Sequence, residues 1–413
     1  MRAVLACLAL LAGAAAAEPP AAAPAAAEST ALIDALEAAP LGVVGTIEGK
    51  SALDARSWRA TLRVESVLVG EAGAAPLAIA WEELASARPP RFANGDRLLL
   101  ALEPLPAGSL WRQRFGEPKA LLAVRGVAQR GTAFLRSPSL GSLAVLRHYL
   151  ALPAELRAGP AGQRHLLTLA ADAERALAIS AARRLARASG PTTLGADETK
   201  AALRALSRAD SDAELAAALM SWVERRQPAG LAPALDAALA GAAGPPASFV
   251  HARGLLGEGI PAEREKLLLA SPSAKQRAAA AAVASPEQAG RLADLLRRDG
   301  APEVRAAALA RLARLEGPAA LDTLLDAFDD EDGAVRSSAA EHAAAFGPEA
   351  VPRLREVAER WPWPASQTAV HALRQANSPE SRAVLVELAD EHADQRIRTL
   401  AALALGRGIG HRH

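Results

Sequence analysis

Ala301-Pro-Glu-Val-Arg-Ala-Ala-Ala-Leu-Ala-Arg-Leu-Ala313 is the stretch that decides the fold of this 413-residue chain. Its Val-Arg step, followed by small helix-forming residues, returns at Val335-Arg336 and at Ile397-Arg398. Arg336 lies 31 positions after Arg305, and Arg398 lies 62 positions further on, which is twice 31. Gln367 stands where the same period would place an arginine. An internal period of about 20–50 residues is typical of a solenoid of stacked helical units.

The units are regular over residues 271–413 and less regular over residues 151–270, where glycines and the Pro245-Pro246 pair interrupt the helical pattern. Each regular unit predicts a first helix, a short turn marked by Gly or Pro, and a second helix. We expect the second helices to line the concave surface of the solenoid, which is the usual binding surface of such folds. Their predicted ranges are 286–298, 318–328, 348–360 and 379–391.

The composition favours helices with small side chains. Hydrophobic residues make up 51% of the chain and aromatic residues only 3%, so most apolar surface comes from Ala, Leu and Val. Chains rich in Ala and Leu favour helix. The net charge of +1 provides no global field for nucleic acid or for an anionic membrane. We therefore expect no nucleic-acid partner.

The N-terminus has the pattern of a signal peptide over residues 1–17. Met1-Arg2 is followed by an apolar run, and Ala15-Ala16-Ala17 precedes Glu18 as an A-x-A-like cleavage site. The apolar run is too short to span a bilayer. Residues 18–29 are an Ala/Pro-rich linker. We expect an exported protein, periplasmic or extracellular, with no stable membrane insertion.

Cys7 is the only cysteine of the chain and would leave with the signal peptide. Val4-Leu5-Ala6-Cys7 resembles a lipoprotein box, but Cys7 comes too early for a usable apolar segment to precede it, so lipidation is not expected. The mature chain would have no disulfide, no thiolate nucleophile and no zinc site with cysteine ligands.

Residues 30–150 change from helical to strand periodicity after a short amphipathic helix. Trp58, Ala60, Leu62 and Val64 alternate with polar residues, which is typical of a strand with one buried face. Several short strands at this spacing predict a small antiparallel barrel or sandwich. The predicted fold class is α+β multidomain, with a small antiparallel β-barrel followed by an all-α solenoid. The strands are expected at 42–47, 58–70, 76–81 and 97–103, with a last pair within 121–135.

This part of the chain resembles the netrin-like or TIMP-like OB-type domains of exported bacterial proteins. The resemblance rests on the leading helix, on Val43-Val44-Gly45-Thr46-Ile47, on residues 62–70 (LRVESVLVG) and on residues 92–102 (FANGDRLLLAL). Metalloprotease inhibitors of these families chelate zinc through an N-terminal cysteine. The domain has no cysteine, so that mechanism does not carry over.

The regular units resemble HEAT repeats, specifically the short HEAT-like repeats of phycobilin lyases. Their signature is an acidic turn, then Val-Arg, then Ala-x-x-Ala-Leu-Gly. The matching stretches are Glu303-Val304-Arg305, Asp332 through Val335-Arg336, and Asp394 through Ile397-Arg398 to Gly406. The resemblance covers residues 274–408 and implies an α-solenoid.

Arg305, Arg336 and Arg398 are predicted to be structural, because a residue present once in each repeat is a stacking element more often than a specific site. We expect the acidic residue before each of them to cap the helix. The arginine would then reach across to the neighbouring repeat, and its loss would lower stability without altering ligand binding. The specific positions are expected where the frame is interrupted, at Gln367 and at the turn before it.

Two surface features are candidate protein contacts. Asp329, Asp330 and Glu331 form an acidic turn that does not fit an EF-hand, because the first and twelfth ligand positions would fall on Phe328 and Ala339. Trp361 and Trp363, in the sequence Trp-Pro-Trp-Pro, are either an interaction hot spot or a hydrophobic staple between helix ends.

The sequence predicts no catalytic residues, no cofactor and no metal site. It contains no Gly-x-Ser-x-Gly, P-loop or dinucleotide fingerprint, and none of its eight histidines forms a metal-binding motif. His411 and His413 in the tail are suited at most to adventitious metal binding. The preferred interpretation is an exported, non-catalytic scaffold or adaptor that binds a protein or peptide partner on the solenoid surface. Two alternatives stay open: an enzyme-accessory protein of the lyase type, and a netrin-like protease-binding module.

Overall fold

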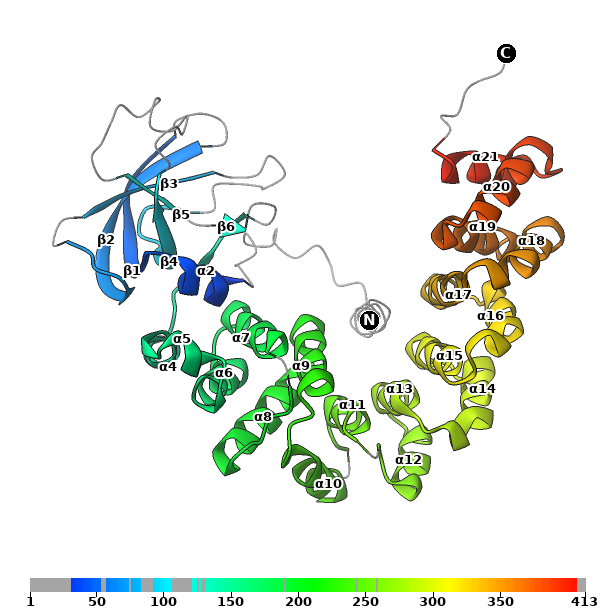
Figure 1. The fold of residues 1–413 in the computed structure, drawn as a ribbon, viewed down its shortest axis with the longest axis horizontal. Coiled ribbons are helices and arrows are strands. Elements are labelled where there is room, and N and C mark those ends of the chain that lie inside the picture. Colours follow the sequence, from blue (N-terminus) through cyan, green and yellow to red (C-terminus); the bar gives the residue numbers. More distant parts are fainter. Residues whose placement is uncertain are drawn as a thin grey trace, which may run out of the picture. The chain divides into compact units, whose positions relative to one another are not determined.

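The computed structural model describes residues 31–52, 57–73, 76–82, 92–105, 121–124, 126–127, 131–188, 190–241, 244–257 and 259–406 (Figure 1). The predicted signal peptide and linker, Cys7, His411 and His413 lie outside these residues. Within the described part, no helix has both the length and the apolar character needed to cross a membrane. Contacts divide the chain into two compact units, one within residues 16–238 and the other within residues 239–413. This division follows packing, so it differs from the sequence-based one, which follows the regularity of the repeats.

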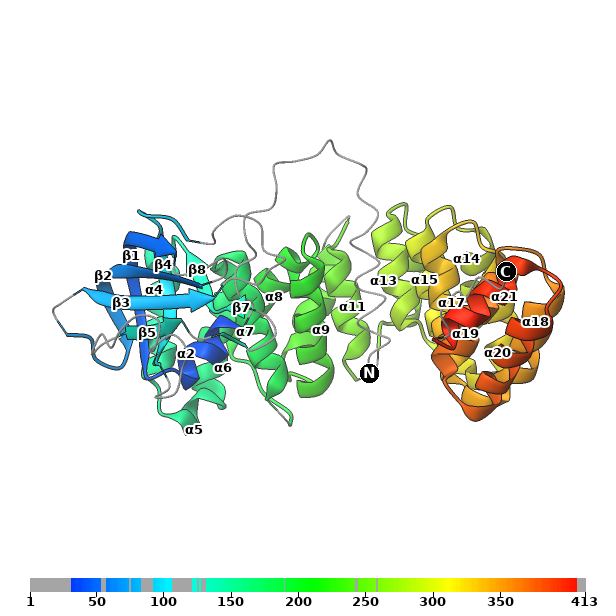
Figure 2. The same cartoon turned by 90° about the horizontal axis from the view of Figure 1, so that it is seen from above.

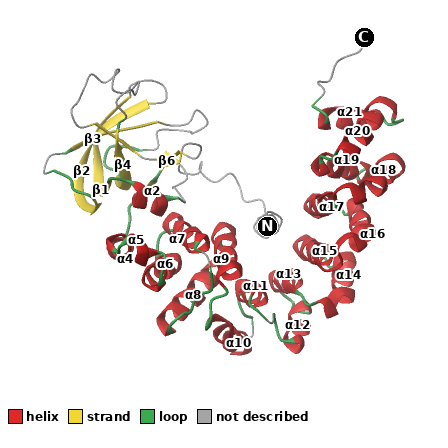
Figure 3. Cartoon of the chain, in the orientation of Figure 1, coloured by secondary structure: helices red, strands yellow, loops and turns green. Residues whose placement is uncertain are grey.

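Five strands of the first unit close into a barrel (Figure 3). β1 pairs with both β2 and β4, and β5 lies between β3 and β4. The predicted barrel is confirmed, and this order is that of an OB-type barrel. One detail differs from an all-antiparallel barrel, because β3 and β5 run parallel. The strands are β1 Leu41–Ala52, β2 Ser57–Val69, β3 Leu77–Glu82, β4 Arg97–Pro104 and β5 Leu121–Val124.

Three short strands complete the sheet structure. β8 (Phe134–Arg136) pairs antiparallel with residues 98–100 of β4. β6 (Gly126–Val127) and β7 (Gly131–Thr132) form a separate hairpin.

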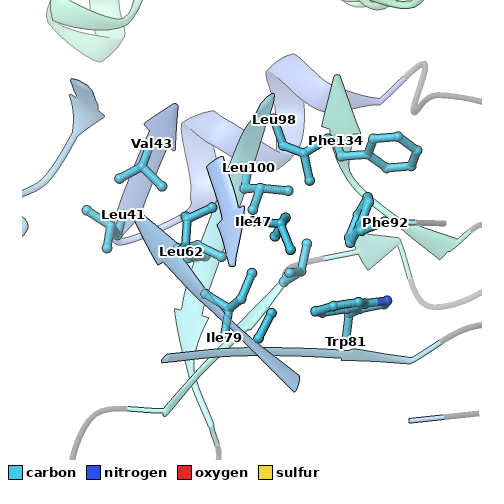
Figure 4. Packing of buried hydrophobic residues seen from close by; sticks show 13 residues of the cluster. Leu41, Val43, Ile47, Leu62, Ile79, Trp81, Phe92, Leu98, Leu100 and Phe134 are labelled. Atoms are coloured by element: carbon cyan, nitrogen blue, oxygen red, sulfur yellow. The ribbon is translucent and has the colours of Figure 1, made fainter. Parts of the chain in front are cut away.

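The barrel core forms where the alternating apolar residues meet (Figure 4). Ala60 and Leu62 are buried in it, and Trp58 and Val64 pack against it, so the predicted inward face of this strand is confirmed. Phe92 is the centre of an aromatic cluster, since its ring lies 5.0 Å from that of Trp81 and 4.9 Å from that of Phe134.

The short helix α2 (Leu32–Ala38) joins the barrel to the helices that follow it (Figure 2). The Ile33 amide donates to the Ser180 hydroxyl at 2.9 Å. Glu37 accepts a hydrogen bond from the Tyr149 hydroxyl and pairs with Arg184 at 3.1 Å. The barrel and its helices are therefore one packed unit. These helices are α4 Leu140–Ala151, α5 Ala154–Arg157, α6 Pro160–Asp172, α7 Arg175–Arg187, α8 Ala196–Ala209 and α9 Ala213–Arg226.

The second unit begins within α10 (Leu231–Gly241) and consists of helices arranged in two rows. After α11 (Ala247–Leu255) and α12 (Ala262–Leu269), one helix of each repeat falls in each row. We call the first row α13 Ala274–Val283, α15 Pro302–Glu316, α17 Gly333–Ala345, α19 Ala365–Ala376 and α21 Gln395–Ala404. The second row is α14 Ala289–Arg298, α16 Leu321–Asp326, α18 Val351–Arg360 and α20 Pro379–Glu391.

The second-row helices occupy the segments predicted for them, and most follow a short 3₁₀ turn that contains the predicted proline. The expectation that they line the concave surface is wrong. Within this unit, the first-row helices lie on the inner side of the curve (Figure 1). First-row helices pack more closely on one another than second-row helices do, and their buried residues are mostly Ala, whereas those of the second row are mostly Leu and Val.

Gly70→Ala should destabilise the barrel more than Gly49→Ala. Both glycines have positive φ, +73° and +60°, so both substitutions cost backbone strain of about 1 kcal/mol. Only at Gly70 does the added Cβ meet a backbone atom, the Pro40 carbonyl oxygen at 2.1 Å. This clash adds about 1–3 kcal/mol. Amide hydrogen exchange in β1 and β2 measures the difference, and equal protection in the two variants would contradict the predicted clash with the Pro40 carbonyl oxygen.

Candidate functional site

The recurring arginines occupy one structural position. Arg277, Arg305, Arg336 and Arg398 are each the fourth residue of a first-row helix, and we call them the arginine ladder. In each, Nη1 donates to the carbonyl oxygen six residues earlier, where the preceding helix has ended. Three of these hydrogen bonds measure 2.8, 2.9 and 2.6 Å. The ladder therefore ties the starts of α13, α15, α17 and α21 to the turns before them.

In Arg277 and Arg305 the other edge of the guanidinium binds an aspartate of the following repeat, whereas in Arg398 this edge donates to Gln395 of the same helix. Arg277 donates to both carboxylate oxygens of Asp299 at 2.7 and 2.8 Å, and Arg305 binds Asp330 in the same way at 2.9 and 2.8 Å. The side chains of Arg305 and Asp330 are only 7% and 11% exposed. Such two-point pairing is geometrically specific as well as strong.

Each aspartate is held for this role by its own turn. Asp299 accepts from the Ala301 amide at 2.9 Å, and Asp330 accepts from the Asp332 amide at 2.8 Å. Burial raises the pKa of Asp299, but the hydrogen bonds from Arg277 and Ala301 outweigh burial and keep this pKa below its ordinary value. The carboxylate is thus charged when it meets the guanidinium.

The ladder is interrupted at one repeat. Asp299 and Asp330 are 31 positions apart, and the next residue in this frame is Trp361, which has no carboxylate. Nε and Nη2 of Arg336 have no hydrogen-bond acceptor among the described residues, whereas the same two atoms of Arg305 bind Asp330. Gln367 takes the place of the next arginine. The predicted break in the frame therefore coincides with an incomplete ion pair.

A pocket of about 410 Å³ lies at this interruption, between α17 and α19. Arg374 on its wall is exposed and makes no hydrogen bond or ion pair within the described part of the chain. Burial, with the nearby charge of Arg374, lowers the pKa of His371, so this histidine is neutral at pH 7. The lining residues are Gly333, Arg336, Ser337 and Ala340 of α17, and Gln367, Thr368, His371, Arg374 and Gln375 of α19.

The acidic candidates have different surroundings. The carboxylate of Asp330 accepts a hydrogen bond from Arg305, so it faces the neighbouring repeat. Glu331 also contacts Arg305, at 3.3 Å, but its side chain is 84% exposed, and Asp329 is exposed. A partner contact at Asp329 and Glu331 stays a prediction. The predicted helix cap is confirmed at Asp332, which accepts from the Ala334 amide at 2.8 Å, and at Asp394, which accepts from the Arg396 amide at 2.8 Å. It is wrong for Glu303, because the N-cap of α15 is Ala301 and no side chain of the described residues caps this helix.

The tryptophan turn lies between α18 and α19. The Trp363 side chain is 38% exposed, and the guanidinium of Arg396 lies 4.8 Å from its ring, so it contacts the first turn of α21. This contact favours the interpretation as a staple between repeats. Trp361 is half-buried and ends α18, with its amide bonded to the Val357 carbonyl. Neither tryptophan lines the pocket, and a role in partner contact stays a prediction for both.

Two histidines are buried in the second unit. Burial and then the charge of Arg314 lower the pKa of His251 to about 4, and the same causes lower the pKa of His342. His148 and His165 of the first unit have ring centres 6.1 Å apart. Nowhere in the described residues do three or more His, Cys, Asp or Glu side chains gather so that they could hold a metal ion.

The sequence reasoning missed two parts of the ladder. Arg277 lies 28 rather than 31 positions before Arg305, so a strict period passes over it, although Gln276-Arg277-Ala-Ala-Ala repeats the local pattern. The carboxylate partners were also missed, although Asp299 and Asp330 share the frame and its next position is Trp361.

Comparison with known proteins supports the identification of helical repeats in the second unit. Residues 262–345 and 289–374 match the family described as HEAT repeats. The second unit is thus a HEAT-like repeat region, as predicted, and the first contains a β-rich domain. Among curated proteins, none matches the chain. The X-ray structure of YibA from Escherichia coli aligns with 66% of this chain and 99% of its own, with 16% identity and a TM-score of 0.33, which is too weak to support an argument.

Arg305→Ala should lower the free energy of unfolding by about 3 kcal/mol, because it leaves the Asp330 carboxylate buried without its cation. Arg353→Ala is the matched control. Its ion pair with Asp322 has side chains 44% and 79% exposed, and pairs of this kind contribute at most about 1 kcal/mol. Urea denaturation measures both. Equal effects would show that the buried pair does not hold the repeats together.

Stability should fall as the pH falls from about 6.5 to about 4, because of His251. In this window the unfolded histidine binds a proton, while the folded one stays neutral until its pKa of about 4. One proton contributes a slope of up to about 1.4 kcal/mol per pH unit. His251→Gln should flatten the dependence, whereas replacement of the exposed His148 by Gln should not. Denaturation at several pH values tests this, and an unchanged slope in His251→Gln would contradict it.

Proposed function

We propose that this protein is an exported, non-catalytic scaffold that binds a protein or peptide partner on the first-row surface of its HEAT repeats. The observation that carries the proposal is the polar pocket between α17 and α19, which contains an arginine edge without an acceptor among the described residues. Elsewhere in the ladder, Arg277 and Arg305 satisfy this edge within the fold. A guanidinium edge that has no acceptor within the described fold is available to a carboxylate of a partner.

The surroundings of the pocket suit recognition by a preformed surface. Its two walls are helices whose starts are fixed: Asp332 caps α17, and Thr368 in α19 donates to the carbonyl of Pro364 at 3.1 Å. Alanines of the two helices pack between them, which keeps the backbones close. A ligand that binds walls held in this way loses little affinity to ordering them.

A photo-crosslinking amino acid at Gln375 tests the proposal. This residue is exposed at the pocket. In cells that export the protein, we expect one defined partner to crosslink from Gln375 and not from the exposed Glu349, which precedes second-row helix α18. Glu71 after β2, also exposed, probes the alternative that the barrel is the effector. Crosslinking from Glu71 alone, or equally from all three positions, would contradict the proposal.

Export makes a separate prediction. If residues 1–17 are a signal peptide, the protein recovered from a bacterial periplasm should begin at Glu18, and its intact mass should show this. Replacing Ala15 and Ala17 by Leu should block cleavage, while the same change at Ala22 and Ala26 in the linker should not. An N-terminus at Met1 in the unaltered protein would rule out the proposed export route.

A further inference from the structure

We infer that the pocket between α17 and α19 binds a carboxylate of an acidic peptide segment, which supplies to Arg336 the acid that the ladder lacks at Trp361. This inference rests on the proposed function and specifies the chemistry of the partner. It follows from three features of the second unit: the edge of Arg336, the backbone at Trp361 and the other groups in the pocket.

The edge of Arg336 is prepared for a carboxylate. Nη1 is bonded to the Asp330 carbonyl at 2.6 Å, just as Nη1 of Arg305 is bonded to the Asp299 carbonyl at 2.9 Å. In Arg305 this anchoring leaves Nε and Nη2 side by side on the two oxygens of one carboxylate. Since Arg336 is anchored in the same way, its Nε and Nη2 present the same fork. A planar guanidinium fork matches a carboxylate with two parallel hydrogen bonds.

At Trp361 the backbone is that of the two aspartates, and only the side chain differs. Asp299, Asp330 and Trp361 each follow the last residue of a second-row helix or its 3₁₀ extension. Their φ/ψ angles are −70°/132°, −56°/142° and −89°/151°, which is one extended conformation. An aspartate at 361 would therefore start from the backbone position that places Asp330 on Arg305. The fold therefore keeps the backbone conformation of this position but has no carboxylate there.

The rest of the pocket suits an acidic segment rather than a single ion. Arg374 adds a second positive charge without a partner in the described chain, one turn of α19 beyond His371. Ser337, Gln367 and Gln375 add neutral groups that hydrogen-bond to a peptide backbone. No carboxylate lines the pocket. Two cations at separate places, with amides between them, fit a peptide with two nearby acidic side chains.

The chain itself contains a suitable probe. Residues 327–333 (AFDDEDG) include the acidic turn that Arg305 binds. This heptapeptide, with acetyl and amide ends, should bind the full mature protein in calorimetry at low salt. The same peptide with Asn and Gln in place of Asp and Glu should not bind. Inorganic phosphate is the second ligand to test, and phosphate binding as tight as that of the acidic peptide would overturn the assignment to a peptide carboxylate.

Arg336→Gln should weaken binding of the acidic peptide at least tenfold, since a hydrogen bond to a charged group contributes about 1.5–3 kcal/mol. Arg374→Gln removes no contact of the ladder and should weaken binding severalfold while leaving the fold intact. Arg382→Gln is the matched control. Arg382 is exposed on second-row helix α20 and makes no side-chain ion pair among the described residues, so its loss should leave binding unchanged. An equal loss in Arg382→Gln would reduce the effect to general charge attraction.

Trp361→Asp tests the inference without removing a cation. The new carboxylate should occupy the fork of Arg336, so the acidic peptide should no longer bind although both arginines are present. Undiminished peptide binding by Trp361→Asp, with a native circular dichroism spectrum, would overturn the inference. So would failure of the unaltered protein to bind the peptide. In that case, crosslinking of a partner from Gln375 would still support the scaffold proposal. The two experiments therefore distinguish failure of the carboxylate-binding inference from failure of the scaffold proposal.

Discussion

The first regular repeats of the second unit share one interaction, the buried two-point pair between an arginine of one repeat and an aspartate of the next. At Arg305 and Asp330 this pair is almost fully shielded from water, and its geometry is fixed at both ends by backbone hydrogen bonds. Burying two charges costs several kcal/mol, so the pair contributes specificity of register more clearly than stability. It allows one spacing of the turns, because both hydrogen bonds of the fork must form together.

Among the described residues, the pair that binds Arg305 is missing at Arg336. If Nε and Nη2 of every ladder arginine were bonded within the fold, this row of helices would offer no free guanidinium atoms to a ligand. Here one repeat has tryptophan in place of the acid, and the neighbouring arginine keeps its anchor but lacks its partner. A pocket with a second cation lies at that position. In the proposed binding site, a carboxylate of the partner peptide thus takes the place that an aspartate of the next repeat has at Arg305.

Much of this architecture could be predicted from the sequence, because it depends on local patterns. The 31-residue frame located the repeats, and alternation from Trp58 to Val64 located the inner face of a barrel strand. Pairing between distant segments was harder to predict. Nothing in β3 or β5 indicates that they run parallel, and nothing near Arg305 points to Asp330, which follows 25 positions later. The break at Gln367 was visible in the sequence, but its consequence for Arg336 depends on the stacking of two repeats. The sequence predicted the same structural role for Arg336 as for Arg305. The two arginines do share the hydrogen bond of Nη1 to the backbone, but only Arg305 also binds a carboxylate through Nε.

The most direct test of the account is an NMR measurement of the Nε–H groups of Arg305 and Arg336, assigned by single Arg→Lys variants. The Nε–H of Arg305 should exchange slowly with water in the unliganded protein, because it is bonded to a buried carboxylate. The Nε–H of Arg336 should exchange rapidly, and it should become protected, with a shift toward that of Arg305, only when an acidic peptide is added. Protection of Arg336 in the unliganded protein, or no change on addition of the peptide, would contradict the claim that the ladder leaves this place for a ligand.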